Sequence, residues 1–227
     1  MVIKIGVLGG IGPEATGEFY NRLILSLQKN GLVKNNQEYP QIIINSISAP
    51  ELVEEKITNS DLEPYITGLK ELDKLKPDFI VMVCNTIHLF REFLQGKIKA
   101  PILDLRQEVR EYLSKMNVKS ALVIGTRNTL NKGLYKFDDI KYILPNEKEQ
   151  LILSESIINF NKGLDKEEQI EKTKKICLGY IREGAETVIL GCTEFAVMLQ
   201  NEKFSKVNTI EIMVESVIGR FKVLSSL

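Results

Sequence analysis

Two stretches of the sequence decide the fold: residues 77–88 (PDFIVMVCNTIH) and residues 185–196 (AETVILGCTEFA). Each contains an apolar run that leads into a cysteine, and two polar residues and the expected start of a helix follow the cysteine. Short apolar runs with β-branched residues are typical of buried strands. Because the two stretches lie about half the chain apart, the sequence predicts an internal duplication that forms two similar lobes.

The rest of the chain alternates short apolar runs with longer amphipathic stretches. Strands that alternate with helices predict an α/β fold, with a parallel sheet flanked by helices in each lobe. We expect residues 1–103 plus 210–227 to form the first lobe and residues 104–209 the second, related by pseudo-two-fold symmetry. The longest expected loop comprises residues 46–59. The expected strands are 2–8, 41–45, 79–83, 98–103, 121–124, 141–144 and 187–190, and the expected helices are 13–29, 61–75, 147–162, 166–182 and one that includes Val214 and Phe221.

Composition excludes several classes of protein. The 227 residues are 44% hydrophobic and 26% charged, which is enough apolar material for a globular core. Lys plus Arg and Asp plus Glu are both 30, so the net charge predicts no nucleic-acid partner and no membrane surface. The start, MVIKIGVLGG, is too short in its apolar part for a secretory signal. Three widely spaced cysteines argue against a disulfide framework, so we expect a cytoplasmic protein.

Cys84 and Cys192 each stand where a strand is expected to end and a helix to begin. Ligands of parallel α/β sheets bind at the carboxyl ends of the strands. Backbone N–H groups at a helix start lower the pKa of a thiol there and favour a thiolate. A single such cysteine is explained as well by burial in the core, but a pair in matching contexts favours a function. Cys177 differs, because it shares one helical face with Ile170 and Ile181, and we expect it to pack in the core.

The chemistry must use two thiols and at most one histidine. His88, four residues after Cys84, can serve as a base for only one of the cysteines, and no C-x-x-C pair is present. With so few candidate ligands, we expect no metal site. Two thiols on opposite faces of one carbon can act as base and acid, which inverts the stereocentre. The developing enolate needs hydrogen-bond donors, which Asn85, Thr86 and Thr193 can supply together with backbone N–H groups.

Two loops are candidates for binding an anion. Gly10-x-Gly12-x-x-Ala15 follows the first strand and formally matches the dinucleotide fingerprint, but Asn45 stands where that fingerprint requires an acidic residue. We therefore expect a glycine turn that brings the backbone of Gly10 close to a small anion. In the second half, Thr126 is either a plain helix N-cap or part of an anion-facing loop.

The motifs GVLGGIGPEAT (6–16), VCNTIH (83–88) and LGCTE (190–194) together resemble the aspartate/glutamate racemase family. The resemblance covers nearly the whole chain in order and spacing. It implies an enzyme that works without pyridoxal phosphate or metal, so no cofactor is expected. It also implies a homodimer of two-lobed subunits, each with its site between the lobes, and Cys84 and Cys192 as the two proton-transfer residues.

The resemblance also implies roles for the neighbouring residues. Asn85 and Thr86 are expected to bind the substrate carboxylate, with Thr193 and its neighbour Glu194 on the opposite side. Thr126 matches a threonine of the second lobe. Lys162 is otherwise a plain helix-end lysine, but it matches a family lysine that faces the side-chain carboxylate of the substrate.

The sequence departs from the family pattern near Leu52, where many aspartate racemases carry an arginine that faces the substrate and this chain has none. This departure argues against aspartate as the sole substrate and leaves glutamate or a broad range of amino acids as further candidates. The leading hypothesis is a racemase that interconverts L- and D-aspartate or glutamate, with an amino acid as its small-molecule partner. A hydantoin racemase, a maleate isomerase and a non-catalytic amino-acid-binding relative remain the alternatives.

Overall fold

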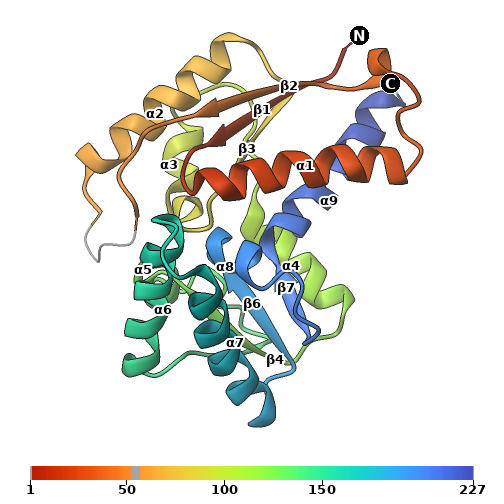
Figure 1. Ribbon diagram of the computed structural model, residues 1–227. Coiled ribbons are helices and arrows are strands. Elements are labelled where there is room, and N and C mark those ends of the chain that lie inside the picture. Colours follow the sequence, from red (N-terminus) through yellow and green to blue (C-terminus); the bar gives the residue numbers. More distant parts are fainter. Residues whose placement is uncertain (1, 53–56, 227) are drawn as a thin grey trace.

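The computed structural model describes residues 2–52 and 57–226, and these form two parallel sheets flanked by helices (Figure 1). The middle of the expected loop 46–59 therefore lies outside the described residues. All strand pairings within both sheets are parallel, as predicted. The first sheet has the order β2 (Gln41–Ser46), β1 (Lys4–Gly9), β3 (Phe79–Met82), and the second has the order β5 (Lys141–Ile143), β4 (Ser120–Gly125), β6 (Thr187–Gly191), β7 (Lys206–Asn208).

The two sheets repeat the same local arrangement. A central strand, β1 or β4, pairs on one side with the next strand in the chain and on the other side with the strand that precedes a cysteine. Register places Leu8 beside Met82 in the first sheet and Gly125 beside Gly191 in the second. The two similar cysteine stretches thus occupy equivalent positions in the two sheets.

The prediction of a strand at residues 98–103 is wrong. Only an isolated bridge between Ile80 and Ile102 forms there. Ile80 donates its N–H to the carbonyl oxygen of Pro101 at 2.8 Å and accepts a hydrogen bond from Leu103 at 2.9 Å. Pro101 has no N–H group to extend the ladder toward residue 98, and Asp104 caps a helix that begins at Leu105, so the pairing ends on both sides of this exchange.

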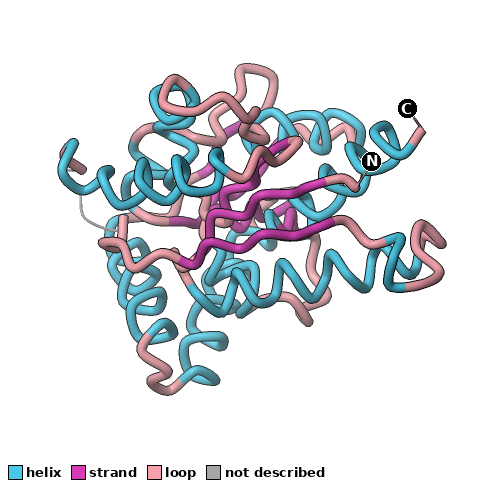
Figure 2. Tube along the Cα trace, turned by 90° about the horizontal axis from the view of Figure 1, so that it is seen from above, coloured by secondary structure: helices cyan, strands magenta, loops and turns pink. Residues whose placement is uncertain are grey.

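Helices cover both sheets (Figure 1 and Figure 2). The predicted helices at 13–29 and 166–182 have the predicted bounds, and a helix starts directly after Cys192 as expected, whereas a 3-10 turn follows Cys84. The helix at Leu105–Lys115 was not predicted, although its buried residues Leu105, Val109 and Leu113 are spaced four apart. The helices are α1 (Pro13–Lys29), α2 (Asn59–Lys74), α3 (Arg91–Gln95), α4 (Leu105–Lys115), α5 (Arg127–Asn131), α6 (Glu147–Asn161), α7 (Lys166–Arg182), α8 (Thr193–Met198) and α9 (Thr209–Ser225), with 3-10 turns at Asn36–Glu38 and Thr86–Phe90.

A continuous hydrophobic core joins the two lobes. The stripe of Ala15, Phe19, Leu23 and Leu27 on α1 is buried in it, and the same cluster contains strand residues of the second sheet. Helix α9 packs against α1 and α4, which returns the C-terminus to the end of the molecule that holds the N-terminus (Figure 1). The lobe boundaries at 103/104 and 209/210 stay a prediction.

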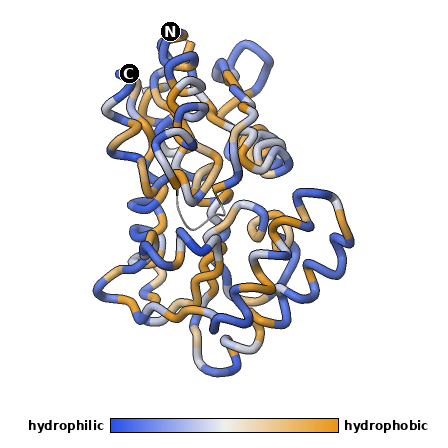
Figure 3. The backbone as a smooth tube through the Cα atoms, turned by 90° about the vertical axis from the view of Figure 1, so that its left-hand side faces the viewer, coloured by the Kyte–Doolittle hydropathy of each residue, from blue (hydrophilic) through white to orange (hydrophobic). Residues whose placement is uncertain are grey.

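The colouring by hydropathy alternates along the helices, as expected for helices with one buried face (Figure 3). Within the described residues, no helix combines the length and the apolar character that a membrane span requires.

Candidate active site

The ends of five strands surround one cavity of about 200 Å³. Cys84 follows β3 and Cys192 follows β6, and both side chains line this cavity although they are only 7% and 6% exposed. The carboxyl ends of parallel strands share one edge of a sheet, and here the two edges face each other. The cavity is lined by Gly10, Ile11, Gly12, Pro13, Ala49, Glu51, Leu52, Cys84, Thr86, Thr126, Ile157, Asn161, Cys192, Thr193 and Glu194.

The glycine turn after β1 forms one wall of the cavity, and its residues must be glycines. Gly10 and Gly12 have φ angles of 85° and 82°, a region that side chains disfavour. A Cβ atom on Gly10 would lie 2.2 Å from the carbonyl oxygen of Ile47. A Cβ atom on Gly12 would lie 2.6 Å from Oε1 of Glu194. The turn therefore brings bare backbone against the residues that follow β2 and β6.

Threonine hydroxyls connect the lobes on another side of the cavity. The Thr86 hydroxyl lies 2.9 Å from that of Thr126 and 3.1 Å from that of Thr129. Thr126 also accepts a hydrogen bond from the N–H of Thr129 and so caps α5. The two interpretations of Thr126 are compatible, because the residue is an N-cap and also lines the cavity.

Glu194 connects the second thiol to the opposite wall. Its carboxylate is buried, and Oε2 accepts a hydrogen bond from Sγ of Cys192 at 2.7 Å. The other oxygen, Oε1, accepts a hydrogen bond from Nδ2 of Asn161 at 3.1 Å. The hydroxyl of Thr193 lies 3.4 Å from Oε2. Glu194 therefore contacts a reactive group directly, which its position after Cys192 alone did not reveal.

The structure corrects the expected position of Lys162. This residue caps the C-terminus of α6, has an exposed side chain and is not among the residues that line the cavity. The preceding residue, Asn161, lines the cavity in its place. One step along a helix rotates the side chain by about 100°, so the choice between two adjacent residues depends on how α6 packs.

Asn85 is also placed differently from the expectation. Its amide donates a hydrogen bond to the Thr209 hydroxyl at 3.1 Å and accepts one from the hydroxyl of Tyr135. Asn85 is 1% exposed and is not among the residues that line the cavity. Asn85 therefore supports the loop that carries Cys84, and its distant partner Tyr135 had no signal in the sequence.

The expectation of low thiol pKa values is wrong for the protein without substrate. Burial raises the pKa of Cys84 to about 12, although the backbone N–H groups of Ile87 and Thr86 oppose this shift. Burial and the neighbouring Glu194 carboxylate raise the pKa of Cys192 well above its usual value. The elements after the cysteines are short, five residues in the turn Thr86–Phe90 and six in α8, so their dipoles are too small to offset desolvation.

The remaining cysteine and the histidine lie outside the cavity. Cys177, on α7, is fully buried in the core, as predicted. His88 lies with Nε2 3.3 Å from the carbonyl oxygen of Met82, and burial lowers its pKa to about 4, so the ring is neutral. Among the described residues, no group of three or more metal-ligating side chains comes together.

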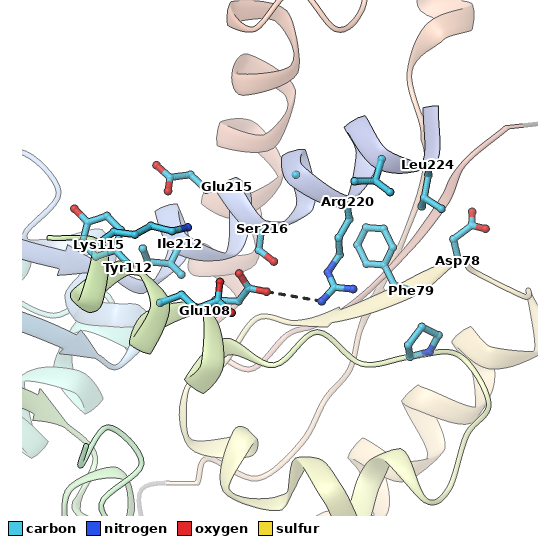
Figure 4. A pocket seen from close by; sticks show the side chains of 14 residues that line it. Asp78, Phe79, Glu108, Tyr112, Lys115, Ile212, Glu215, Ser216, Arg220 and Leu224 are labelled. Carbon is cyan, nitrogen blue, oxygen red and sulfur yellow. Dashed lines mark ion pairs between the residues drawn. The ribbon is translucent and has the colours of Figure 1, made fainter. Parts of the chain in front are cut away.

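A second cavity, of about 550 Å³, lies between α4 and α9 (Figure 4). It contains an ion pair between Arg220 and Glu108 at 3.7 Å, beside Phe79 and Tyr112. None of the described residues that line it is a cysteine or one of the catalytic or substrate-binding residues predicted from the sequence. The candidate active site is therefore the smaller cavity that holds both thiols.

Comparisons with known proteins identify relatives of this chain and solved structures with the same fold. A curated relative, the broad specificity amino-acid racemase RacX of Bacillus subtilis (strain 168), is 31% identical over 133 residues, which is 58% of each chain. The aligned region thus spans less than two thirds of that relative.

Solved structures share the fold at low identity. The aspartate racemase of Picrophilus torridus matches with a TM-score of 0.79 and 21% identity over 97% of this chain and 94% of its own. An aspartate racemase homologue from Pyrococcus horikoshii OT3 matches with a TM-score of 0.70 and 24% identity over 96% and 99%. The model of the Asp/Glu/Hydantoin racemase family matches residues 8–217. The chain therefore belongs to the Asp/Glu/Hydantoin racemase family.

Proposed function

We propose that the protein is an amino-acid racemase that transfers the Cα proton of its substrate between Cys84 and Cys192. The observation that carries this proposal is the presence of both thiols in one cavity, each at the end of an equivalent strand. Membership of the racemase family supports it, and so does the relative named as a broad specificity amino-acid racemase.

The reaction balances with side chains alone. One thiolate takes the Cα proton, so a C–H bond breaks and an S–H bond forms. The opposite thiol then gives its proton to the other face of the planar carbon, which breaks its S–H bond and forms the new C–H bond. The result is the enantiomer, with the thiol and thiolate exchanged between the two cysteines, and no cofactor is needed.

The two cysteines differ in the ease with which they ionise. Cys84 faces the backbone N–H groups of Thr86 and Ile87, which stabilise a thiolate. Cys192 donates a hydrogen bond to the Glu194 carboxylate, and the negative charge of that carboxylate disfavours a thiolate. We infer that Cys84 is the base and Cys192 the acid in the resting protein, and that the substrate's α-ammonium group offsets part of the cost of burying the thiolate.

The hydroxyls of Thr86, Thr126 and Thr193 line the cavity beside the thiols. We assign them to the substrate carboxylate, where they donate hydrogen bonds as negative charge develops during removal of the Cα proton. Aspartate and glutamate are the substrates that the resemblance implies, and both belong in the first test.

The test is incubation with L-amino acids in D₂O without added cofactor, followed by proton NMR of the Cα–H signal and chiral chromatography. We expect loss of the signal together with formation of the D-enantiomer. Cys84→Ser and Cys192→Ser should each slow racemisation by roughly 10²- to 10⁴-fold, the usual contribution of a general acid or base. Cys177→Ala, in the core, is the matched control. Full racemisation by both single variants would refute the proposal.

The homodimer implied by the resemblance stays a prediction. Size-exclusion chromatography with light scattering tests it directly, with a mass of twice 25.8 kDa as the expected result.

A further inference from the structure

The charges of the cavity lining are unlike those expected for a dicarboxylic substrate. Among the described lining residues, the ionisable side chains apart from the two thiols are Glu51 and Glu194. No Lys, Arg or His is among the described residues that line it, and Lys162 is exposed outside the lining. Residues 53–56, outside the described part, add two glutamates and one lysine to the sequence. Among the described lining residues, a second substrate carboxylate would meet no cation and would face two carboxylates, which is costly.

The carboxylates of Glu51 and Glu194 are linked through one side chain of the cavity lining. Nδ2 of Asn161 lies 3.1 Å from Oε1 of Glu194 and 3.4 Å from Oε1 of Glu51, so one amide connects both. Glu194 is buried beside Cys192, whereas Glu51 and Asn161 are exposed. Within the described residues, Glu51 makes only this one long hydrogen bond. Because a carboxylate has about four acceptor sites, Glu51 keeps most of its capacity for a ligand.

From this arrangement we propose that the cavity selects amino acids with a positively charged side chain, such as lysine, ornithine and arginine. The inference rests on the proposed function and names its substrate class. A basic amino acid carries two cations and one carboxylate. Glu194, next to Cys192, takes the α-ammonium group, and Glu51 at the mouth takes the cation of the side chain. Leu52, Ile157 and Ala49 supply apolar surface for the methylene stem between them.

The positive charge of a basic substrate also favours ionisation of the thiols. Burial and the Glu194 carboxylate both keep the pKa of Cys84 high. A substrate with a net positive charge offsets the negative charge of the two carboxylates and favours the thiolate that removes the Cα proton. A substrate with a net negative charge has the opposite effect.

The first experiment compares kcat/KM for Cα deuterium exchange in D₂O with L-lysine, L-ornithine, L-arginine, L-methionine, L-aspartate and L-glutamate. We expect the basic amino acids to exceed aspartate and glutamate by at least tenfold. Faster exchange of aspartate or glutamate would overturn the inference and leave the racemase proposal intact. Exchange of none of the six would instead refute the racemase proposal itself.

The second experiment tests Glu51. Glu51→Gln should lower the ratio of kcat/KM for lysine to that for methionine by about tenfold, which corresponds to about 1.4 kcal/mol. Glu51→Lys should move the preference toward glutamate. Glu63→Gln, an exposed position on α2 outside the cavity lining, removes the same charge and should leave the ratio as in the wild type. An equal ratio in Glu51→Gln and Glu63→Gln would refute the assignment of Glu51, and thermal unfolding confirms that each variant is folded.

Discussion

Replacement of Glu194 by glutamine tests whether this carboxylate raises the pKa of Cys192 more than that of Cys84. The Glu194 carboxylate accepts a hydrogen bond from Cys192 at 2.7 Å, and its charge raises the pKa of that thiol. Glutamine keeps the shape and one acceptor oxygen but removes the charge. The Cys192 thiolate should then form at lower pH. The Cys84 pKa should fall less, because Glu194 acts on Cys84 only through its charge, whereas it also accepts a hydrogen bond from Cys192.

The size of the effect follows from Coulomb's law. Two like charges about 4 Å apart repel by about 4 kcal/mol at an effective dielectric constant near 20, so we take roughly 2–4 kcal/mol as the range. Since about 1.4 kcal/mol is a factor of ten, the thiolate population at a fixed pH should rise by roughly 30- to 800-fold. A more acidic thiol is also a weaker nucleophile, with a Brønsted slope of about 0.45. The net gain in alkylation rate is therefore roughly 6- to 40-fold.

The assay is alkylation by iodoacetamide at pH 8, with the modified peptides identified by mass spectrometry. Cys192 in Glu194→Gln should react roughly 6- to 40-fold faster than in the wild type, and Cys84 should be accelerated less. Glu215→Gln, in the remote cavity between α4 and α9, is the control for loss of a carboxylate. Equal acceleration of both thiols, or none at Cys192, would show that the Glu194 charge does not act on Cys192 as argued.

Three further substitutions test the packing behind the site, each by urea unfolding. Gly17→Ala should raise the free energy of unfolding by roughly 0.5–1 kcal/mol, because Gly17 lies in α1 with open space where a Cβ would point; an unchanged or lower stability would contradict this. Gly12→Ala should cost roughly 1–2 kcal/mol and slow racemisation, since the new Cβ meets Glu194 and the φ angle is 82°; wild-type behaviour would show that the turn relaxes. Tyr135→Phe should cost roughly 1–3 kcal/mol by leaving the buried carbonyl of Asn85 without its donor, and a loss below about 0.5 kcal/mol would mean that another donor replaces the hydroxyl.

Local patterns in the sequence were sufficient to predict most of the fold. The apolar spacing of residues 13–29 has the period of a helix, and the structure buries that stripe at the predicted bounds. The two cysteine stretches correspond to equivalent strands, because a buried parallel strand reads as a short apolar run wherever it occurs. Residues 98–103 read the same way, but pairing there depends on donors that Pro101 lacks.

The two-sheet α/β architecture, the cysteines at the two strand ends and the glycine turn could all be predicted from the sequence, since each depends on local residue chemistry and on the periodicity of one element. Which polar side chains face the cavity became visible only in the packed structure. Asn161 lines it and Lys162 does not, and Asn85 turns toward Tyr135, fifty residues away in the chain. These choices depend on how helices and loops pack across the two lobes, and contacts between residues far apart in the sequence leave no local pattern.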